Sequence, residues 1–211
     1  MGLRQFASGA GALVVMAVLA GCGGAPTTPG SSSPAVPTVS CVYTPAGSAA
    51  KPVSLPPGTA PATGTLTVTL RMDAGDVTMT LDRAGAPCAV HSFESLAAQH
   101  YFDDTSCHRL EPGFVLQCGD PTGTSRGGPG YRYADELSGK ETYTYGVVAM
   151  ANAGPDTNGS QFFIVLGKDV GLPPQYDVLG SVSTAGMTVV ESIVAQGLAQ
   201  GGAHIATVAV S

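Results

Sequence analysis

The sequence predicts a mainly β fold, an antiparallel barrel or sandwich that carries two helices. Three observations support this: many short apolar segments, several of which alternate with period two, abundant glycine, and only 11% charged residues. Such a composition suits a compact sheet with many turns better than a helical bundle. The formal net charge is −6 and there is no basic run, so we expect no nucleic-acid partner.

The folded domain is expected to cover residues 65–211. Apolar side chains occupy every second position of residues 66–70 and 77–81, and the polar turn between them predicts a β-hairpin. One helix is expected from Pro87, which suits a first helical turn, and a second over residues 187–197, which carry an apolar stripe. Further short strands are predicted at residues 107–110, 114–118, 145–151, 161–166, 176–182 and 205–210.

Residues 1–21 have the pattern of an export signal. Arg4 precedes an apolar stretch that is shorter than the ~20 residues needed to span a bilayer, and the stretch ends in Leu-Ala-Gly-Cys at 19–22. This ending resembles the bacterial lipobox, so Cys22 is the predicted lipidation site. We therefore expect an exported protein, lipid-anchored to the outer face of the bacterial cytoplasmic membrane. The alternatives are an ordinary signal peptide with an incidental cysteine and a retained transmembrane anchor.

Residues 22–64 are expected to be a tether. Nine of the 16 prolines lie here, with many Gly, Ser and Thr residues, and Lys51 is its only charged residue. Such a segment cannot bury a core, which predicts a disordered or polyproline-like chain. Cys41, beside Val42 and Tyr43, interrupts this pattern and suggests a local attachment to the folded domain.

Three segments carry a more specific pattern. They are HRLEPGFVLQCGD at residues 108–120, GVVAMANAGPDTNGSQFFI at 146–164 and LPPQYDVLG at 172–180. Their order and spacing resemble the cyclophilin family over about residues 65–211. The resemblance implies an eight-stranded antiparallel β-barrel capped by two α-helices. It also implies a peptidyl-prolyl cis/trans isomerase that acts on X-Pro bonds and assists the folding of exported proteins.

The resemblance also assigns a substrate groove. It implies catalytic roles for Arg109, Gln117 and Phe114, where Gln117 orients the guanidinium of Arg109. It implies substrate contacts for Val115, Ala151, Asn152, Gln161, Phe163, Leu172 and Tyr176. The chain departs from the family pattern at Cys107, which replaces a phenylalanine, at Ser125, which replaces a glycine, and at Gly171, where many members have a tryptophan that contacts cyclosporin.

The chemistry explains why these residue types are needed. Rotation about an X-Pro bond meets a barrier of roughly 20 kcal/mol because amide resonance must be broken. No covalent bond is made or cleaved, so we expect no cofactor and no metal. An apolar slot for the proline ring and a guanidinium near the prolyl nitrogen are sufficient, since that nitrogen gains a lone pair only in the twisted state.

Four cysteines besides Cys22 make two disulfides plausible in an exported protein. Period-two alternation places Cys107 on the side of Arg109 and turns Cys118 away, which argues against a Cys107–Cys118 bridge. The resemblance implies that Cys88 and Cys107 occupy positions that are apolar in relatives and could pack together, so we favour Cys88–Cys107 and, with it, Cys41–Cys118. Four reduced thiols are the alternative. The spacing of Cys107, His108 and Cys118 matches no zinc framework.

Two other function classes are open at this point. One is a proline-recognising binding module or holdase chaperone with little turnover, and the other is a structural lipoprotein. The joint presence of Arg109 and Gln117 favours the enzyme, because a pure binder could lose either residue. The expected partners are proline-containing polypeptides and, through the lipid, the membrane, and we expect a monomer.

Overall fold

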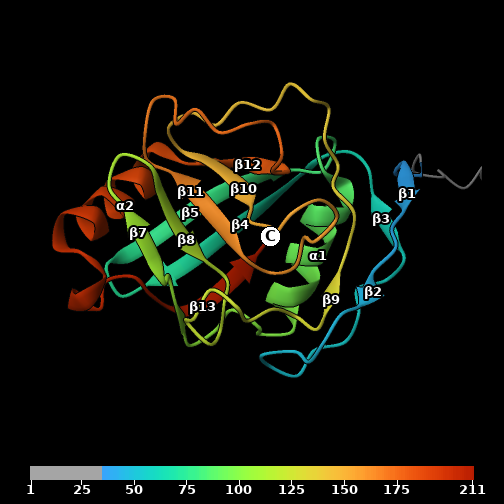
Figure 1. Ribbon diagram of the computed structural model, residues 1–211, viewed down its shortest axis with the longest axis horizontal. Helices are drawn as coiled ribbons and strands as arrows, with labels where there is room; N and C mark the ends of the chain where they lie inside the picture. The colour runs from blue at the N-terminus through green and yellow to red at the C-terminus, as the bar shows by residue number, and fades with distance from the viewer. Residues whose placement is uncertain (1–34) are drawn as a thin grey trace, which may run out of the picture. The chain divides into compact units, whose positions relative to one another are not determined.

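The structure is a computed structural model that describes residues 35–211. The predicted export signal, Cys22 and the first part of the predicted tether lie outside the described residues. The described chain folds around a nine-stranded antiparallel sheet with the order β6-β13-β4-β5-β12-β10-β11-β8-β7 (Figure 1). These strands are β4 (Thr65–Met72), β5 (Gly75–Asp82), β6 (Thr105–Ser106), β7 (Arg109–Glu111), β8 (Val115–Cys118), β10 (Val147–Met150), β11 (Phe162–Val165), β12 (Val178–Val182) and β13 (His204–Val210).

The two edges of this sheet are neighbours in the sequence. Strands β6 and β7 stand at opposite ends of the strand order, yet only Cys107 and His108 separate them. The sheet must therefore curl until its edges meet. Counted as one strand bent at Cys107–His108, β6 and β7 complete the eight strands of the expected barrel. The predicted mainly β class with two helices is confirmed.

The hairpin and both helices form where the sequence predicts them. Strands β4 and β5 pair from Thr65↔Asp82 to Met72↔Gly75. Helix α1 spans Pro87–Ala98, and helix α2 spans Thr184–Gln196, followed by the short 3₁₀ helix η1 (Leu198–Gln200). Helix α2 begins three residues before the predicted start because the Ser183 hydroxyl caps it by accepting the Gly186 N–H at 3.0 Å. Within residues 35–211, neither α1 nor α2 is long and apolar enough to cross a membrane.

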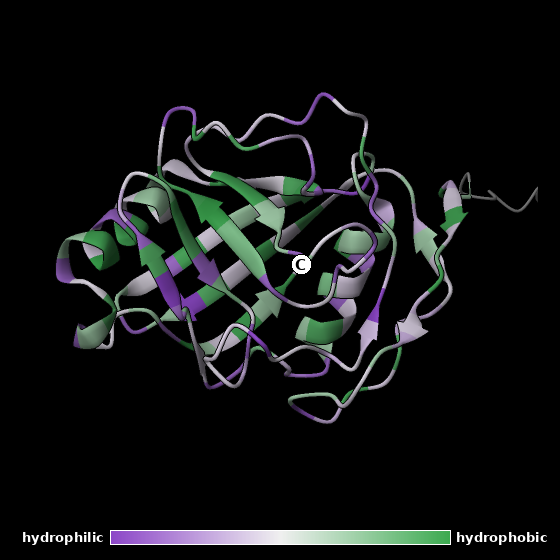
Figure 2. Cartoon of the chain, in the orientation of Figure 1, coloured by the Kyte–Doolittle hydropathy of each residue, from purple (hydrophilic) through white to green (hydrophobic). Residues whose placement is uncertain are grey.

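The main core lies on the inner face of the curled sheet. Phe93 of α1 stacks on Phe102 at 4.8 Å between ring centroids and meets Phe162 of β11 edge-on at 5.3 Å. Alternate residues of β4 and β5 are buried in the same cluster. In Figure 2 the arrows of β10 and β11 are coloured as apolar over most of their length. Every residue of β11 is buried, so this strand has apolar neighbours on both faces.

Residues 35–64 are folded, which differs from the expected tether. They form β1 (Thr38–Ser40), β2 (Thr44–Pro45) and β3 (Thr59–Pro61); β1 pairs with β3, and β2 pairs with β9 (Tyr131–Arg132). Figure 1 shows these strands beside α1 and β9. Tyr43 packs edge-on against Tyr131 and Tyr133 at 5.6 and 5.5 Å. Composition predicted disorder because few apolar residues lie here, but Cys41, Tyr43 and Ala60 are all buried against the domain.

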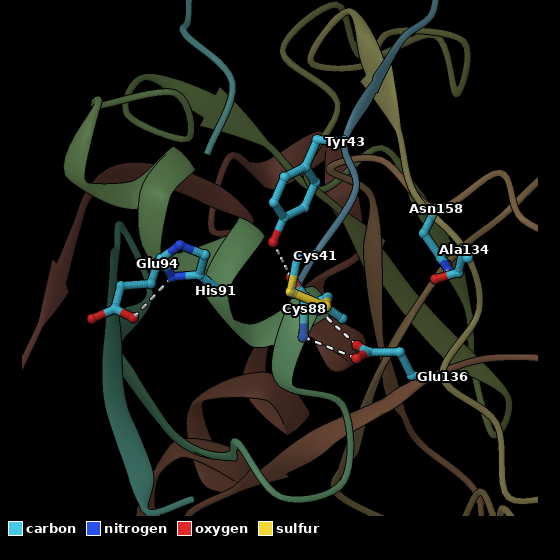
Figure 3. Close-up of a disulfide and its surroundings, with 9 residues drawn as sticks. Cys41, Tyr43, Cys88, His91, Glu94, Ala134, Glu136 and Asn158 are labelled. Carbon is cyan, nitrogen blue, oxygen red and sulfur yellow. Dashed lines mark hydrogen bonds and ion pairs between the residues drawn. A yellow bond between two sulfur atoms is a disulfide. The ribbon is translucent and has the colours of Figure 1, made fainter. Parts of the chain in front are cut away.

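The four cysteines form two disulfides, and the expected pairing was wrong. The bridges are Cys41–Cys88 and Cys107–Cys118, the first of which is drawn in Figure 3. The error lay in extending strand alternation from Arg109 back to Cys107. Strand β7 begins at Arg109, and Cys107 lies in the bend before it, where its N–H donates to the Ala203 carbonyl. The side chain of Cys107 is consequently buried beside Cys118 rather than exposed with Arg109. The expected local attachment at Cys41 is confirmed as a bond to α1.

Candidate functional site

Three neighbouring strands align three predicted site residues, Arg109, Gln117 and Phe163, in one row across the sheet, and β10 extends the row with Ala149. Arg109 of β7 lies opposite Gln117 of β8, Gln117 lies opposite Phe163 of β11, and Phe163 lies opposite Ala149 of β10. Residues in register on antiparallel strands share a face of the sheet. Buried Leu116 and Ile164 alternate with these residues and belong to the core on the other face. The row is therefore on the outer face of the barrel.

Arg109 stands at the exposed end of the row. Its Nη1–H donates to Gln117 Oε1 at 3.3 Å, and its Nε–H and Nη2–H both donate to Glu111 Oε1, at 2.9 and 2.6 Å. The guanidinium carbon lies 5.8 Å from the centroid of the Phe114 ring, within range of a cation–π attraction. Arg109 thus keeps a fixed charge at the surface, with N–H groups left to meet a substrate.

Gln117 links the arginine to the far side of the groove. Its Nε2–H donates to Gln161 Oε1 at 2.8 Å, and Gln161 Nε2–H donates to the Gly127 carbonyl at 2.9 Å. Because each amide has its oxygen occupied on one side and its nitrogen on the other, the chain fixes the orientation of both glutamines. The predicted site residues Arg109, Gln117 and Gln161 therefore form one hydrogen-bonded line.

An apolar cluster, separate from the main core, lies beside this line. Its buried members are Val115, Tyr143, Ala149, Phe163 and Val165, and its partly buried members include Phe114, Ala151, Leu172 and Tyr176. The Phe163 ring is only 4% exposed and meets Tyr176 edge-on at 5.5 Å, so it forms the base of the cluster. The predicted apolar slot residues Phe114, Val115, Phe163 and Leu172 all belong to it.

Tyr143 holds the loop between β11 and β12 (residues 166–177, the Tyr176 loop) over the cluster. Its hydroxyl donates to the Tyr176 carbonyl and accepts the Tyr176 N–H, both at 2.9 Å. Burial raises the pKa of this hydroxyl, so the phenol stays protonated and keeps both bonds. The predicted contacts Ala151 and Asn152 lie next to this loop: the Ala151 N–H donates to the Gln161 carbonyl at 2.9 Å, and Asn152 Nδ2–H donates to the Gln175 carbonyl at 2.8 Å.

Asp120 organises the loop between β8 and β9 (residues 119–130, the rim loop). Its carboxylate accepts the backbone N–H groups of Thr122, Thr124 and Gly127 at 2.7, 3.1 and 3.1 Å. Burial alone would raise the pKa of Asp120, but these hydrogen bonds outweigh burial and lower it. Ser125 at the loop tip has φ +64°, so serine does occupy a left-handed position there.

A buried carboxyl group, Asp177, and a half-buried one, Glu136, lie behind the Tyr176 loop. Asp177 Oδ1 accepts the Glu136 N–H at 2.7 Å, and burial raises the pKa of Asp177 to about 7. Glu136 accepts the N–H groups of Cys88 and Ala89 at the start of α1, at 3.0 and 2.9 Å. Burial raises its pKa, although these two bonds act in the opposite direction. These acids support the site from behind and do not face the apolar cluster.

The chain offers no cluster suited to a metal within residues 35–211. Cys107 and Cys118 are joined to each other, and both ring nitrogens of His108 are buried without a partner among the described residues. Burial lowers the pKa of His108, which favours a neutral ring. This agrees with the structural role that its position beside Arg109 suggests.

Sequence reasoning missed three parts of the site: Glu111, Tyr143 and residues 46–48, which contribute to a cavity beside the glutamine line. Glu111 was detectable, because a residue two positions from Arg109 on one strand shares its face. Tyr143 and residues 46–48 reach the site only through long-range contacts, so no local pattern signals them.

Comparisons with known proteins agree with this geometry. Residues 67–209 match the family described as cyclophilin type peptidyl-prolyl cis-trans isomerase/CLD. The chain is similar to the probable peptidyl-prolyl cis-trans isomerase B of Mycobacterium leprae, with 42% identity over 182 residues. That alignment covers 78% of this chain and 61% of the relative. The corresponding protein of Mycobacterium tuberculosis is also 42% identical, over 77% of this chain and 58% of its own length. The chain thus spans about three fifths of the length of these relatives.

Solved structures show the same likeness. A cyclophilin-type isomerase of Cryptosporidium parvum superposes with a TM-score of 0.64 at 28% identity and covers 70% of this chain and 98% of its own. The structure of that protein in the presence of the dipeptide Ala-Pro gives a TM-score of 0.63 at 29% identity, and it covers 69% of this chain and 98% of its own. The family match, the relatives and the barrel with its outer-face row of residues all agree: the chain belongs to the cyclophilin-type peptidyl-prolyl cis-trans isomerase family.

Proposed function

We propose that this chain catalyses cis/trans isomerisation of X-Pro bonds in exported polypeptides and so assists their folding. One observation carries the proposal: Arg109, held by Gln117 and Glu111, stands at the edge of the apolar cluster that has Phe163 at its base. A proline ring in that cluster brings the prolyl nitrogen toward an N–H donor of fixed charge. The Cryptosporidium isomerase, solved in the presence of the dipeptide Ala-Pro, supports proline-containing peptides as substrates.

The mechanism follows from the electronic change at nitrogen. In a planar amide the nitrogen lone pair is delocalised and accepts a hydrogen bond poorly, whereas in the twisted amide the lone pair is localised. A guanidinium hydrogen bond therefore stabilises the twisted state more than either planar isomer, which lowers the barrier. Gln117 and Glu111 act as positioning residues, because they fix the guanidinium before the substrate arrives.

The test is the isomerisation of a proline-containing peptide by the Arg109→Ala variant of the full chain. We expect kcat/KM to fall about 100-fold or more, equivalent to about 3 kcal/mol of transition-state stabilisation, with the circular dichroism spectrum unchanged. Leu55→Ala, at an exposed position outside the groove, is the control and should keep full activity. A folded Arg109→Ala variant with wild-type activity would contradict the mechanism.

The second candidate is a proline-binding module with little turnover. Equal peptide affinity in wild type and Arg109→Ala, together with no acceleration of isomerisation by either protein, would support it. The Arg109–Gln117 bond favours the enzyme, because a site that only binds the planar isomers needs no donor directed at the prolyl nitrogen.

We further propose that the protein is an exported lipoprotein, anchored through Cys22 to the outer face of the bacterial cytoplasmic membrane as a monomer. The pattern of residues 1–22 supports this, and two disulfides are compatible with an oxidising compartment. Labelling with a radioactive fatty acid should mark the wild type and not Cys22→Ser; equal labelling would exclude lipidation at Cys22. Analytical ultracentrifugation of the chain without its signal tests the monomer.

A further inference from the structure

A cavity of about 630 Å³ adjoins the proposed proline site. It shares four residues with that site: Gln117, Ala151, Asn152 and Gln161. Three other segments contribute to its lining: residues 125–132 of the rim loop and β9, residues 153–160, and residues 46–48 of the N-terminal segment 35–64. A polypeptide that places proline in the apolar cluster therefore passes beside this cavity and can direct a neighbouring side chain into it.

Backbone pairing holds residues 46–48 against the rim loop. Strand β2 pairs with β9. Beyond it, the Ala46 N–H donates to the Gly130 carbonyl and the Ala50 N–H donates to the Gly128 carbonyl, both at 2.8 Å. Gly130 has φ +77°, and a Cβ there would lie 2.8 Å from the Ala49 nitrogen. The rim loop thus carries a glycine at a place where the N-terminal segment approaches closely.

Covalent and aromatic contacts then anchor the segment to α1. Cys41 is bonded to Cys88, and the Tyr43 hydroxyl donates to the Cys88 carbonyl at 2.8 Å (Figure 3). The Tyr43 ring packs on Tyr131, the residue next to Arg132 in the cavity lining. Residues 46–48 are therefore a fixed wall of the cavity.

The charged residues that line the cavity are positive. Within the described range 35–211, the charged residues of its lining are Arg126 and Arg132, and no carboxylate contributes. Neither arginine has a carboxylate partner within 4 Å among those residues, whereas Arg83 and Arg109 both do. The other lining residues are small or neutral, including Gly47, Ser48 and Ser125. In a chain of net charge −6, two unpaired arginines around one cavity favour an anionic occupant.

We propose that this cavity is a specificity site that takes an acidic side chain, Asp or Glu, near the proline of the substrate, with residues 46–48 as one of its walls. The proposal rests on the proline binding that the proposed function requires, because the substrate chain must first place its proline beside Gln117. It extends substrate recognition beyond the X-Pro unit to a segment that precedes the catalytic barrel in the sequence.

The test compares proline peptides that carry Glu, Gln or Lys at each of the three positions before and two positions after proline. At one position, we expect the Glu peptide to exceed its Gln twin in kcat/KM by about threefold to tenfold, the range of one or two partly exposed ion pairs. The Lys peptide should be the poorest, and the preference should shrink at 0.5 M salt. The Arg126→Gln/Arg132→Gln double variant should lose the preference, whereas Arg71→Gln, at an exposed position of β4, should retain it.

A second pair of variants tests the wall itself. Ser48→Glu places a carboxylate in the cavity and should abolish or reverse the preference, while the similarly sized Ser48→Gln should keep it. Equal kcat/KM for Glu, Gln and Lys peptides at every position, or an unchanged preference in Ser48→Glu, would overturn the proposal.

Direct binding of the same peptides, labelled with a fluorophore and measured by anisotropy, separates the acidic site from isomerase turnover. A Glu preference in affinity without any isomerisation refutes the proposed enzyme and keeps the acidic site, and isomerisation without a Glu preference does the reverse.

Discussion

The Cys41–Cys88 disulfide should be the stronger of the two covalent constraints on the fold. It joins residues 47 positions apart, whereas Cys107–Cys118 joins residues 11 positions apart. A cross-link restricts the unfolded chain more when it closes a longer loop. The chain-entropy relation gives about 4 kcal/mol for the longer loop and about 3 kcal/mol for the shorter one.

The measurement uses two variants that each retain one disulfide. Cys107→Ala/Cys118→Ala keeps the long loop, and Cys41→Ala/Cys88→Ala keeps the short one. For each variant, the free energy of unfolding in urea is determined with the disulfide intact and with it reduced to two thiols. The two forms then have the same sequence and differ only in the cross-link. Reduction should cost about 4 kcal/mol in the first variant, a decrease in melting temperature of roughly 8–16 °C for a domain of this size.

The result also tests the position of the N-terminal segment. If reduction of the long-loop variant costs less than reduction of the short-loop variant, the segment does not constrain the domain as the structure indicates. Peptide mapping of the non-reduced wild type provides the independent check, since it must find Cys41 linked to Cys88.

Three further predictions concern the site. Glu111→Gln should lower kcat/KM by less than about fivefold, because a half-exposed ion pair that only positions Arg109 contributes up to ~1 kcal/mol. A loss as large as that of Arg109→Ala would mean that Glu111 itself contacts the substrate. The pKa of Asp177 is raised by burial from 3.8 to about 7, so the folded state binds the proton more tightly than the unfolded state, and the free energy of unfolding should fall by up to about 4 kcal/mol as pH rises from 4 to 7. Asp177→Asn should flatten that dependence in urea titrations at pH 5 and pH 8, and an unchanged slope would assign the dependence to other groups. Inhibition by cyclosporin should be weak because Gly171 supplies no indole, and low-nanomolar inhibition would contradict this.

Several strands, including those of the candidate site, were predictable from the sequence because their information is local. Period-two alternation located β4 and β5, and the same alternation places Arg109 and Glu111 on one face. The family motifs then located Gln117, Gln161 and Phe163, which the register of β7, β8 and β11 brings together. Alternation failed at Cys107, where the strand bends, because a period of two holds only while the backbone stays extended.

The segment at 35–64 could not be predicted from its composition, because its order comes from distant partners. The Lys51 ammonium donates to the Asp103 carbonyl, the Ser54 N–H donates to Gln99 Oε1 at 2.7 Å, and Tyr43 packs on a strand nearly ninety residues away. Proline and glycine lower the propensity for helix and strand, but they do not prevent an irregular chain from packing where a surface already exists. A disulfide to α1 makes that packing permanent in an oxidising compartment.

Helix α1 shows how such distant contacts connect the segment to the site. Its N-cap residue, Ala86, has no side-chain oxygen, so the sequence offers no local cap for the first N–H groups. The Glu136 carboxylate supplies the cap instead, from 47 and 48 residues away, where the helix dipole also favours negative charge. The Glu136 N–H in turn donates to Asp177, the neighbour of Tyr176 in the apolar cluster, and Cys88 at the same helix end carries the bond to Cys41. The N-terminus of α1 is therefore the point at which the cavity wall, the helix and the Tyr176 loop are fixed to one another.

Glu136→Gln keeps the size of the cap and removes its charge, so it should destabilise the fold by about 1 kcal/mol without altering the Arg109–Gln117 pair. A loss of kcat/KM as large as that of Arg109→Ala, in a folded Glu136→Gln variant, would instead place Glu136 in the catalytic machinery.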